Sequence, residues 1–123
     1  MTKDLAFPGP EVPVIDETRL TAEFGSDPEI LAELRDLFLE HIPPLFQEIQ
    51  EALDTGDAAT LTINAHSLKG ASATYGALRL AMVCREFEIL AKEGDLATIR
   101  THLGKLAEEY EKVRLELGAI EVS

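Results

Sequence analysis

The sequence has 123 residues, enough for one domain that buries a hydrophobic core without disulfides. Its 11 basic and 23 acidic residues give a net charge of -12, which argues against binding to nucleic acid or an anionic membrane, because both attract basic surfaces. We therefore expect a protein partner. A single cysteine cannot form an internal disulfide, no apolar run approaches the roughly 20 residues that span a membrane, and the N-terminus lacks a signal-peptide core, so we expect a cytoplasmic protein.

The N-terminal segment is rich in proline, which disfavours helices and strands. The first 16 residues contain Pro8, Pro10 and Pro13. Residues 1–15 are therefore predicted to be an extended or disordered tail. A short helix is predicted from Asp16 to Phe24, with Leu20 and Phe24 as apolar anchors one turn apart, and it would close one end of a bundle.

A long helix is predicted to begin near Ser26. Ser26 and Glu29 have the spacing of a capping box, and Pro28 lies in the first turn, where its missing N–H costs nothing. Apolar residues recur at intervals of three and four along one face: Leu31, Leu34, Phe38, Ile42, Leu45, Ile49 and Leu53. Pro43 and Pro44 interrupt this helix, which predicts a kink, with two shorter helices as the alternative.

Two Gly-Asp pairs, at 56–57 and 94–95, predict points where one helix ends and the next begins. Three further helices are predicted over Asp57–Tyr75, Ala77–Lys92 and Asp95–Leu117. The last two have inward rows formed by Leu80, Cys84, Phe87 and Ala91, and by Leu96, Ile99, Leu103, Leu106, Tyr110, Val113 and Leu117. No segment alternates as a strand and the connections are short, so the fold prediction is all-α: an up-down antiparallel four-helix bundle over residues 16–119, with a short extra N-terminal helix.

The helix predicted over residues 57–75 has an unusual outer face. Its inward row is Leu61, Ala65, Leu68, Ser72 and Tyr75. At about 100° per residue, His66 points roughly 140° away from that row and faces water. Ile63, Gly70 and Ala73 share the outer face, with Lys69 at its edge. An ordinary solvated face would carry several charges, so this face is predicted to meet a partner.

Each of these residues has a use if His66 accepts a phosphoryl group. A neutral imidazole nitrogen is nucleophilic near pH 7. Lys69, three residues on, can reach the oxygens of the bound group. Gly70 costs the helix about 1 kcal/mol relative to alanine, which makes sense if a partner's backbone comes close. Ile63 and Ala73 would then form an apolar contact ring for the partner.

Residues 66–76, with the sequence HSLKGASATYG, resemble the signature of histidine-containing phosphotransfer (HPt) domains. The resemblance extends over about residues 15–117, including the region of Phe38, the Gly-Asp helix starts and the sequence CREFE at 84–88. It implies a phosphorelay carrier that takes a phosphoryl group on His66 from one receiver-domain aspartate and passes it to another, supported by Lys69 and Gly70. It also implies that Glu88 lies beside the histidine, within the surface that docks the partner.

The resemblance further implies how such a carrier works with its partners. The carrier has no turnover of its own and binds no cofactor or metal, while Mg²⁺ belongs to the receiver domain. The partners are response-regulator receiver domains and a hybrid histidine kinase. We expect a monomer, and Met1 with the proline-rich tail favours a free-standing protein.

The remaining candidate residues are predicted to be structural. His41 precedes Pro43 and is expected to bond carbonyls freed near the kink, while His102 lies off the inward row of its helix. Cys84 is expected to pack as a small hydrophobic residue. Four charged residues of the last helix are predicted to form a solvated face: Glu108, Glu109, Glu111 and Lys112.

Two other functions fit the same pattern. The bundle could be an interaction module that docks on a receiver or kinase and regulates it without carrying phosphate. That module would be favoured if receiver binding were unchanged when His66 is replaced and if the chain carried no transferable phosphate. A dimerising histidine kinase bundle is the weaker alternative, since no ATP-binding domain follows in the sequence; autophosphorylation from ATP alone would favour it.

Overall fold

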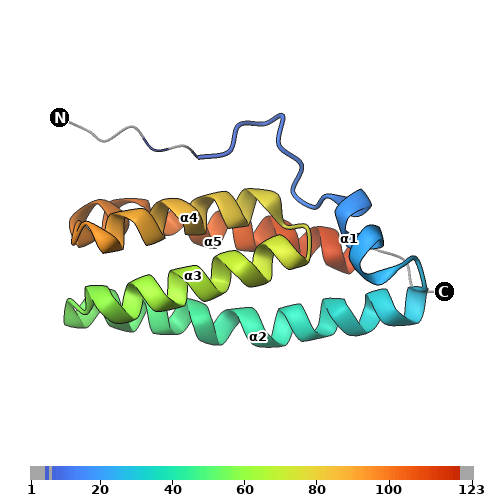
Figure 1. Ribbon diagram of the computed structural model, residues 1–123, viewed down its shortest axis with the longest axis horizontal. Coiled ribbons are helices and arrows are strands. Elements are labelled where there is room, and N and C mark those ends of the chain that lie inside the picture. The colour runs from blue at the N-terminus through green and yellow to red at the C-terminus, as the bar shows by residue number, and fades with distance from the viewer. Residues whose placement is uncertain (1–4, 6, 120–123) are drawn as a thin grey trace.

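The computed structural model describes residue 5 and residues 7–119, and these form five helices and no strand. The helices are α1 (Glu17–Phe24), α2 (Pro28–Thr55), α3 (Ala58–Thr74), α4 (Leu78–Lys92) and α5 (Leu96–Ala119). Helices α2 to α5 run alternately in opposite directions, and α1 lies across one end of the bundle (Figure 1). The predicted all-α up-down antiparallel bundle with an extra N-terminal helix is therefore confirmed.

Helix α2 differs from its prediction at two points. The residue that caps it is Asp27, not Ser26, because Pro28 already occupies the first turn and the Asp27 side chain accepts the N–H of Glu29 at 2.9 Å. The alternative of two shorter helices is wrong, since α2 continues for 28 residues through Pro43 and Pro44. Both prolines are exposed, so water can bond the carbonyls that they free.

The predicted inward rows form the core. In α2, Phe38, Ile42, Ile49 and Leu53 are buried, and the other members of the row pack partly against them. The rows of α4 and α5 meet this cluster, with Leu80, Cys84, Phe87, Ile99 and Leu106 almost fully buried. Burial raises the pKa of the Cys84 thiol, which is consistent with its predicted role as a packed apolar residue.

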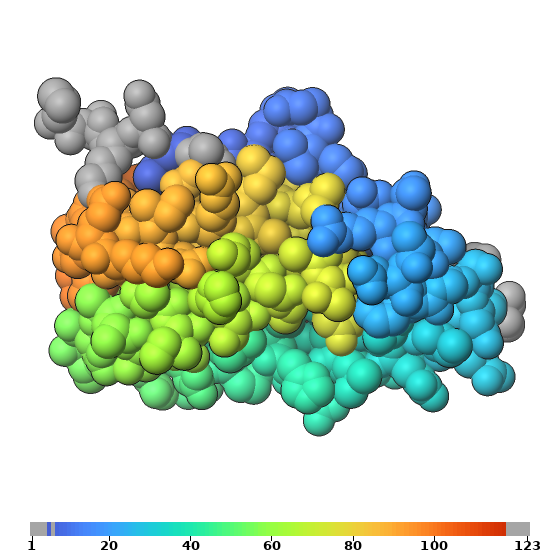
Figure 2. All heavy atoms as spheres, in the orientation of Figure 1, coloured from blue at the N-terminus to red at the C-terminus, as the bar shows by residue number. Residues whose placement is uncertain are grey.

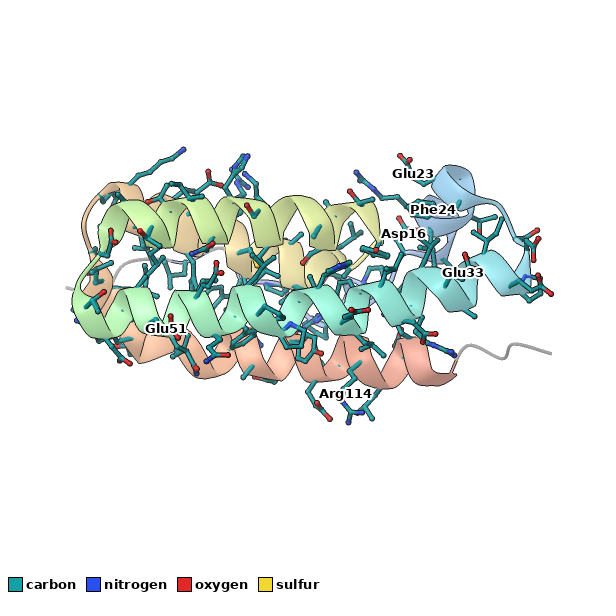
Figure 3. All side chains as sticks on the ribbon, turned by 90° about the horizontal axis from the view of Figure 1, so that it is seen from below. Asp16, Glu23, Phe24, Glu33, Glu51 and Arg114 are labelled. Atoms are coloured by element: carbon teal, nitrogen blue, oxygen red, sulfur yellow. The ribbon has the colours of Figure 1, made fainter. Side chains whose placement is uncertain are left out.

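A cluster of aromatic rings from α1, α2, α5 and Tyr75, the residue that caps the end of α3, lies at the end of the bundle near α1. Phe38 of α2 lies edge-on to Tyr75 at 5.0 Å between ring centroids, and stacks on Tyr110 of α5 at 6.3 Å. Phe24 points from α1 toward the bundle and lies 6.1 Å from Tyr75 (Figure 3). These contacts fix α1 to the bundle.

Residues 7–16, which we call the N-terminal strap, lie along the bundle without regular helix or strand. In Figure 2 the atoms of the strap (blue) rest against those of α4 (yellow to gold). Pro8 and Ile15 are buried, and the Phe7 ring contacts His102 of α5 at 5.3 Å between centroids. The described part of the predicted tail is thus irregular, as expected, but packed.

Gly76 joins the strap to the turn between α3 and α4. Its carbonyl accepts the N–H of Asp16 at 2.7 Å. Its φ of 74° lies in the left-handed region, and a Cβ atom built there would sit 2.7 Å from the Asp16 carbonyl oxygen. Glycine is therefore required at this position for two separate reasons.

The buried carboxylate of Glu109 corrects the prediction of a fully solvated face on α5. The Glu109 side chain is 0% exposed and accepts a hydrogen bond from Arg79 of α4 at 2.7 Å. Burial on its own would raise the pKa of Glu109, but hydrogen bonds from Arg79 and Lys112 outweigh it and hold the pKa below its ordinary value. Glu108 and Glu111, by contrast, are exposed as predicted.

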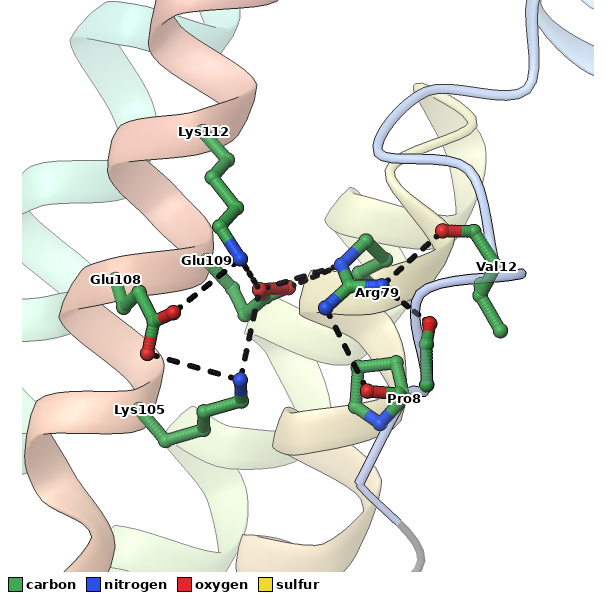
Figure 4. A network of polar contacts seen from close by, with 8 residues as sticks. Pro8, Val12, Arg79, Lys105, Glu108, Glu109 and Lys112 are labelled. Carbon is green, nitrogen blue, oxygen red and sulfur yellow. Dashed lines mark hydrogen bonds and ion pairs between the residues drawn. The ribbon is translucent and has the colours of Figure 1, made fainter.

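Arg79 also connects this ion pair to the strap. Its guanidinium donates to the carbonyls of Val12 at 3.2 Å and Pro8 at 3.5 Å, and to that of Gly9 (Figure 4). Charged groups are rarely buried unless they are paired in this way. One side chain thus ties α4, α5 and the strap together.

Candidate functional site

His66 is displayed near the middle of α3, on the face opposite the core. Leu61, Ala65 and Leu68 of the same helix are almost fully buried, whereas the His66 side chain is 66% exposed. The side chain of Asp57 caps this helix by accepting the N–H of Thr60 at 3.0 Å, which fixes where the helix begins. The orientation predicted for His66 is therefore what the structure has.

Glu88 reaches His66 from the neighbouring helix α4. Its Oε2 lies 2.9 Å from Nδ1 of His66, and its Oε1 accepts a hydrogen bond from Nζ of Lys69 at 2.6 Å. Lys92, one turn further along α4, places its Nζ 3.3 Å from Oε2. The Glu88 side chain is only 8% exposed, so it lies beside the histidine, as the resemblance implied, but offers little surface to a docking partner.

The surrounding donors keep Glu88 ionised. The hydrogen bond from Lys69 has the largest effect and, although burial opposes it, those from His66 and Lys92 act in the same direction, so the pKa of Glu88 falls from 4.5 to about 2. Above that pH the carboxylate can only accept hydrogen bonds. Three donors therefore converge on one acceptor that is charged at neutral pH.

This contact decides which nitrogen of His66 is available. Because an ionised carboxylate has no proton to donate, the 2.9 Å contact requires a proton on Nδ1 of His66. In the neutral ring the lone pair then lies on Nε2. Since the side chain is mostly exposed, the site presents a fixed, nucleophilic nitrogen to the outside.

The other residues predicted on this face of α3 surround His66. Ile63 is 65% exposed, unusually high for an isoleucine, and Ala73 is partly buried. A Cβ atom added to Gly70 would meet nothing within 4 Å, so no contact inside the protein requires a glycine there. Lys69 is 32% exposed and bonded to Glu88, which leaves two of its three N–H groups for other acceptors.

Lys92 was missed by sequence reasoning, although a signal existed. Glu88 and Lys92 are four residues apart on one helix, the spacing at which opposite charges pair. The contacts of Glu88 with His66 and Lys69 had no such local signal, because they join residues 22 and 19 positions apart.

The two other histidines lie on different helices. His41 is exposed on α2. His102 is on α5, and its Nδ1 lies 2.9 Å from the Thr98 carbonyl oxygen.

Neither metal-binding clusters nor membrane-spanning segments occur in the part of the chain that the structure describes. No three His, Cys, Asp or Glu side chains of these residues lie close enough together to hold a metal ion. None of their helices combines the length and apolar character that crossing a membrane requires.

Comparison with known proteins identifies the family. The family model named Hpt domain matches residues 33–116. Among solved structures, the chain is similar to histidine-containing phosphotransfer protein B (HptB) from Pseudomonas aeruginosa PAO1, with a TM-score of 0.80 and 29% identity over 88% of this chain and 94% of that one.

The fold is also that of the HPT domain from the Hpt sensor hybrid histidine kinase of Shewanella, with a TM-score of 0.70 and 22% identity over 87% of this chain and 92% of that one. A search of curated protein sequences gave no significant match. The family model nevertheless spans more than half of the chain and includes the exposed histidine on α3. This chain therefore belongs to the Hpt domain family, whose members serve as phosphoryl carriers, not classical enzymes, in the phosphorelays of two-component signalling.

Proposed function

We propose that His66 is the residue that carries the phosphoryl group, and that it receives the group from the aspartate of one receiver domain and passes it to another. The observation that carries this proposal is the exposed imidazole whose Nδ1 is held by the Glu88 carboxylate at 2.9 Å. A ring fixed in this way keeps Nε2 free and aimed outward, where a partner can reach it.

The transfer step exchanges one bond to phosphorus for another. The Nε2 lone pair attacks the phosphorus of the receiver's aspartyl phosphate, an N–P bond forms, and the P–O bond to the aspartate breaks as its carboxylate leaves. The imidazole ring becomes positively charged as the bond forms, and the Glu88 carboxylate offsets that charge through the proton on Nδ1. Transfer to a second receiver runs the same step in reverse.

Lys69 and Gly70 support this step in different ways. Lys69 holds Glu88 in place and has N–H groups left for the oxygens of the phosphoryl group. Gly70, with open space above its backbone, lets the receiver approach within bonding distance of Nε2. Ile63 and Ala73 supply apolar contacts around the histidine.

The rest of the chemistry belongs to the partner. We propose that the receiver domain supplies Mg²⁺ and the acidic pocket that phosphoryl transfer uses, and that this chain has no turnover of its own. As members of the Hpt domain family are phosphorelay carriers, their partners are receiver domains or kinases, and a hybrid histidine kinase is a candidate donor here.

The test is phosphoryl transfer from a receiver domain that has been radiolabelled beforehand, in the presence of Mg²⁺. We expect the wild-type chain to take up acid-labile, base-stable label and the His66→Gln variant to take up none. His41→Gln is the matched control, because His41 is also exposed on a helix. Label that persists unchanged in His66→Gln would rule out His66 as the carrier.

A further inference from the structure

An apolar pocket lies directly beside the site, between the N-terminal strap and α4. It has a volume of about 330 Å³ and is lined by Val12, Lys69, Leu78, Ala81, Met82 and Arg85. Lys69 belongs to both places, since its ammonium bonds Glu88 while its side chain lines the pocket. The pocket therefore continues the surface around His66.

Val12 of the strap forms one wall of this pocket, and the strap backbone around it is hydrogen-bonded to Arg79. Arg79 donates to the Val12 carbonyl at 3.2 Å, and Glu109 neutralises Arg79 from the far side at 2.7 Å. Val12 itself is only partly buried and lines the pocket. Val12 thus adds to the pocket a surface that α3 and α4 would not have by themselves.

Charge indicates the kind of partner that this surface meets. No acidic residue occurs from Ala58 to Arg85, although the chain has 23 of them, and this stretch contributes Lys69 and Arg85 to the pocket. The apolar lining thus ends at the exposed Arg85 and at Lys69, whose ammonium is paired with Glu88 but has N–H groups left for other acceptors. An acidic partner with an apolar side chain near its reactive carboxylate is complementary to this arrangement.

We propose that the pocket formed by α4, Lys69 and Val12 of the strap receives an aliphatic side chain of the receiver domain while the receiver's aspartate faces His66. The inference rests on the proposed function, because a receiver must approach His66 closely for transfer. Burial of one aliphatic side chain corresponds to about 10- to 100-fold in affinity, enough to discriminate between receivers.

The experiment separates docking from the chemistry at His66. A panel of receiver domains encoded in the same genome, each phosphorylated with acetyl phosphate, is first compared for transfer to the wild-type chain, and the fastest donor is kept. Two pocket variants are then compared with wild type: Ala81→Leu fills the pocket, and Met82→Glu places a charge in it. Leu115→Asp is the control, because Leu115 is an exposed apolar residue on α5 outside the pocket.

Each variant is also labelled with phosphoramidate, a small donor that needs no docking surface, and this reaction reports folding and reactivity of His66. We expect both pocket variants to label normally with phosphoramidate, while their KM for the receiver rises about 10- to 100-fold with little change in kcat. Leu115→Asp should change neither. A wild-type KM in both pocket variants would overturn the inference and leave the proposed function intact. Absence of label on His66 of the wild-type chain with every receiver of the panel would overturn the proposed function, and the inference with it.

Discussion

The Glu88 carboxylate contacts donors from His66, Lys69 and Lys92, and so determines the protonation and orientation of the groups around His66. It orients the imidazole, selects its protonated nitrogen and neutralises two ammonium groups that would otherwise repel each other. Because its side chain is buried beneath the histidine, it acts on the reaction through His66 and not by touching the partner. At the scale of single residues, Glu88 is a positioning residue.

Replacing Glu88 with glutamine should reveal the stability that its charge contributes. The folded-state pKa of about 2 lies below the ordinary 4.5, so the contribution is complete above about pH 4.5 and is lost as the pH falls toward 2. We expect Glu88→Gln to lower the free energy of unfolding by about 1–2 kcal/mol at pH 7, since two of the donors are partly exposed. Urea unfolding at pH 7, 4.5 and 3 checks this. The difference from wild type should shrink at pH 3, and a constant difference would contradict it.

Replacing Gly70 with alanine should separate stability from transfer. A methyl group there meets nothing within the protein, so we expect a gain of about 0.5–1 kcal/mol in the free energy of unfolding from better helix propensity. Transfer from a phosphorylated receiver should slow, because the methyl group blocks close approach to Nε2. Gly104→Ala is the matched control, as Gly104 is also helical with open space around it. Equal transfer rates in the two variants would remove the proposed role of Gly70.

At the scale of elements, the junction between the strap and the turn from α3 to α4 depends on Gly76. The Asp16 carbonyl oxygen lies 2.7 Å from where a Cβ atom of residue 76 would sit, too close for one, and the Gly76 carbonyl accepts the Asp16 N–H. The start of α1 is thereby fixed against the turn that follows the histidine helix. The strap and the helix that presents His66 are thus parts of one packed unit.

Gly76→Ala should therefore destabilise the protein more than a glycine substitution at another left-handed position. Gly94 has a φ of 76° and open space around it, so Gly94→Ala bears only the backbone cost, about 1 kcal/mol. Gly76→Ala adds a clash with backbone, and we expect a total of about 2–3 kcal/mol. Thermal and urea unfolding of both variants measure the difference. Equal losses of unfolding free energy in the two variants would mean that the strap moves away from the added methyl group at no energetic cost.

At the scale of the whole molecule, the buried Arg79–Glu109 pair connects α4, α5 and the strap. The pair is costly to bury, and its two charges are stabilising only while both are present. Glu109 has additional partners in Lys105 at 3.9 Å and Lys112 at 3.1 Å, which keep part of its charge compensated if Arg79 is removed. The network therefore extends from the core to the surface of α5.

A double-mutant cycle on this pair should show strong coupling. We expect Arg79→Met to lower the free energy of unfolding by about 3 kcal/mol, because Glu109 stays buried without its main partner, and Glu109→Gln to cost a similar amount. The double variant should lose less than the sum, with a coupling of about 1–3 kcal/mol. Urea unfolding of the four proteins gives the coupling energy. Additive losses would show that the two residues act independently.

The sequence by itself determined what depends on local helix geometry. The spacing of Leu61, Ala65 and Leu68 placed His66 on the outer face, and the Gly-Asp pairs marked where helices end, because both follow from the fixed rotation per residue and from capping within one or two turns. The continuation of α2 through Pro43 and Pro44 was less predictable, since the packing of its inward row outweighs the loss of two backbone hydrogen bonds.

Which distant residues meet was decided by the tertiary structure, and before it only the family resemblance, not any pattern within the helices, placed Glu88 beside His66. Glu88 reaches His66 only because of the register between α3 and α4, and no periodicity within either helix encodes that register. Glu109 has the sequence context of an exposed residue, yet it is fully buried and paired with Arg79 of another helix. The physical reason is the same in both cases: the energy of a charged group depends on its partners and on its exclusion from water, and both are set by how the helices pack.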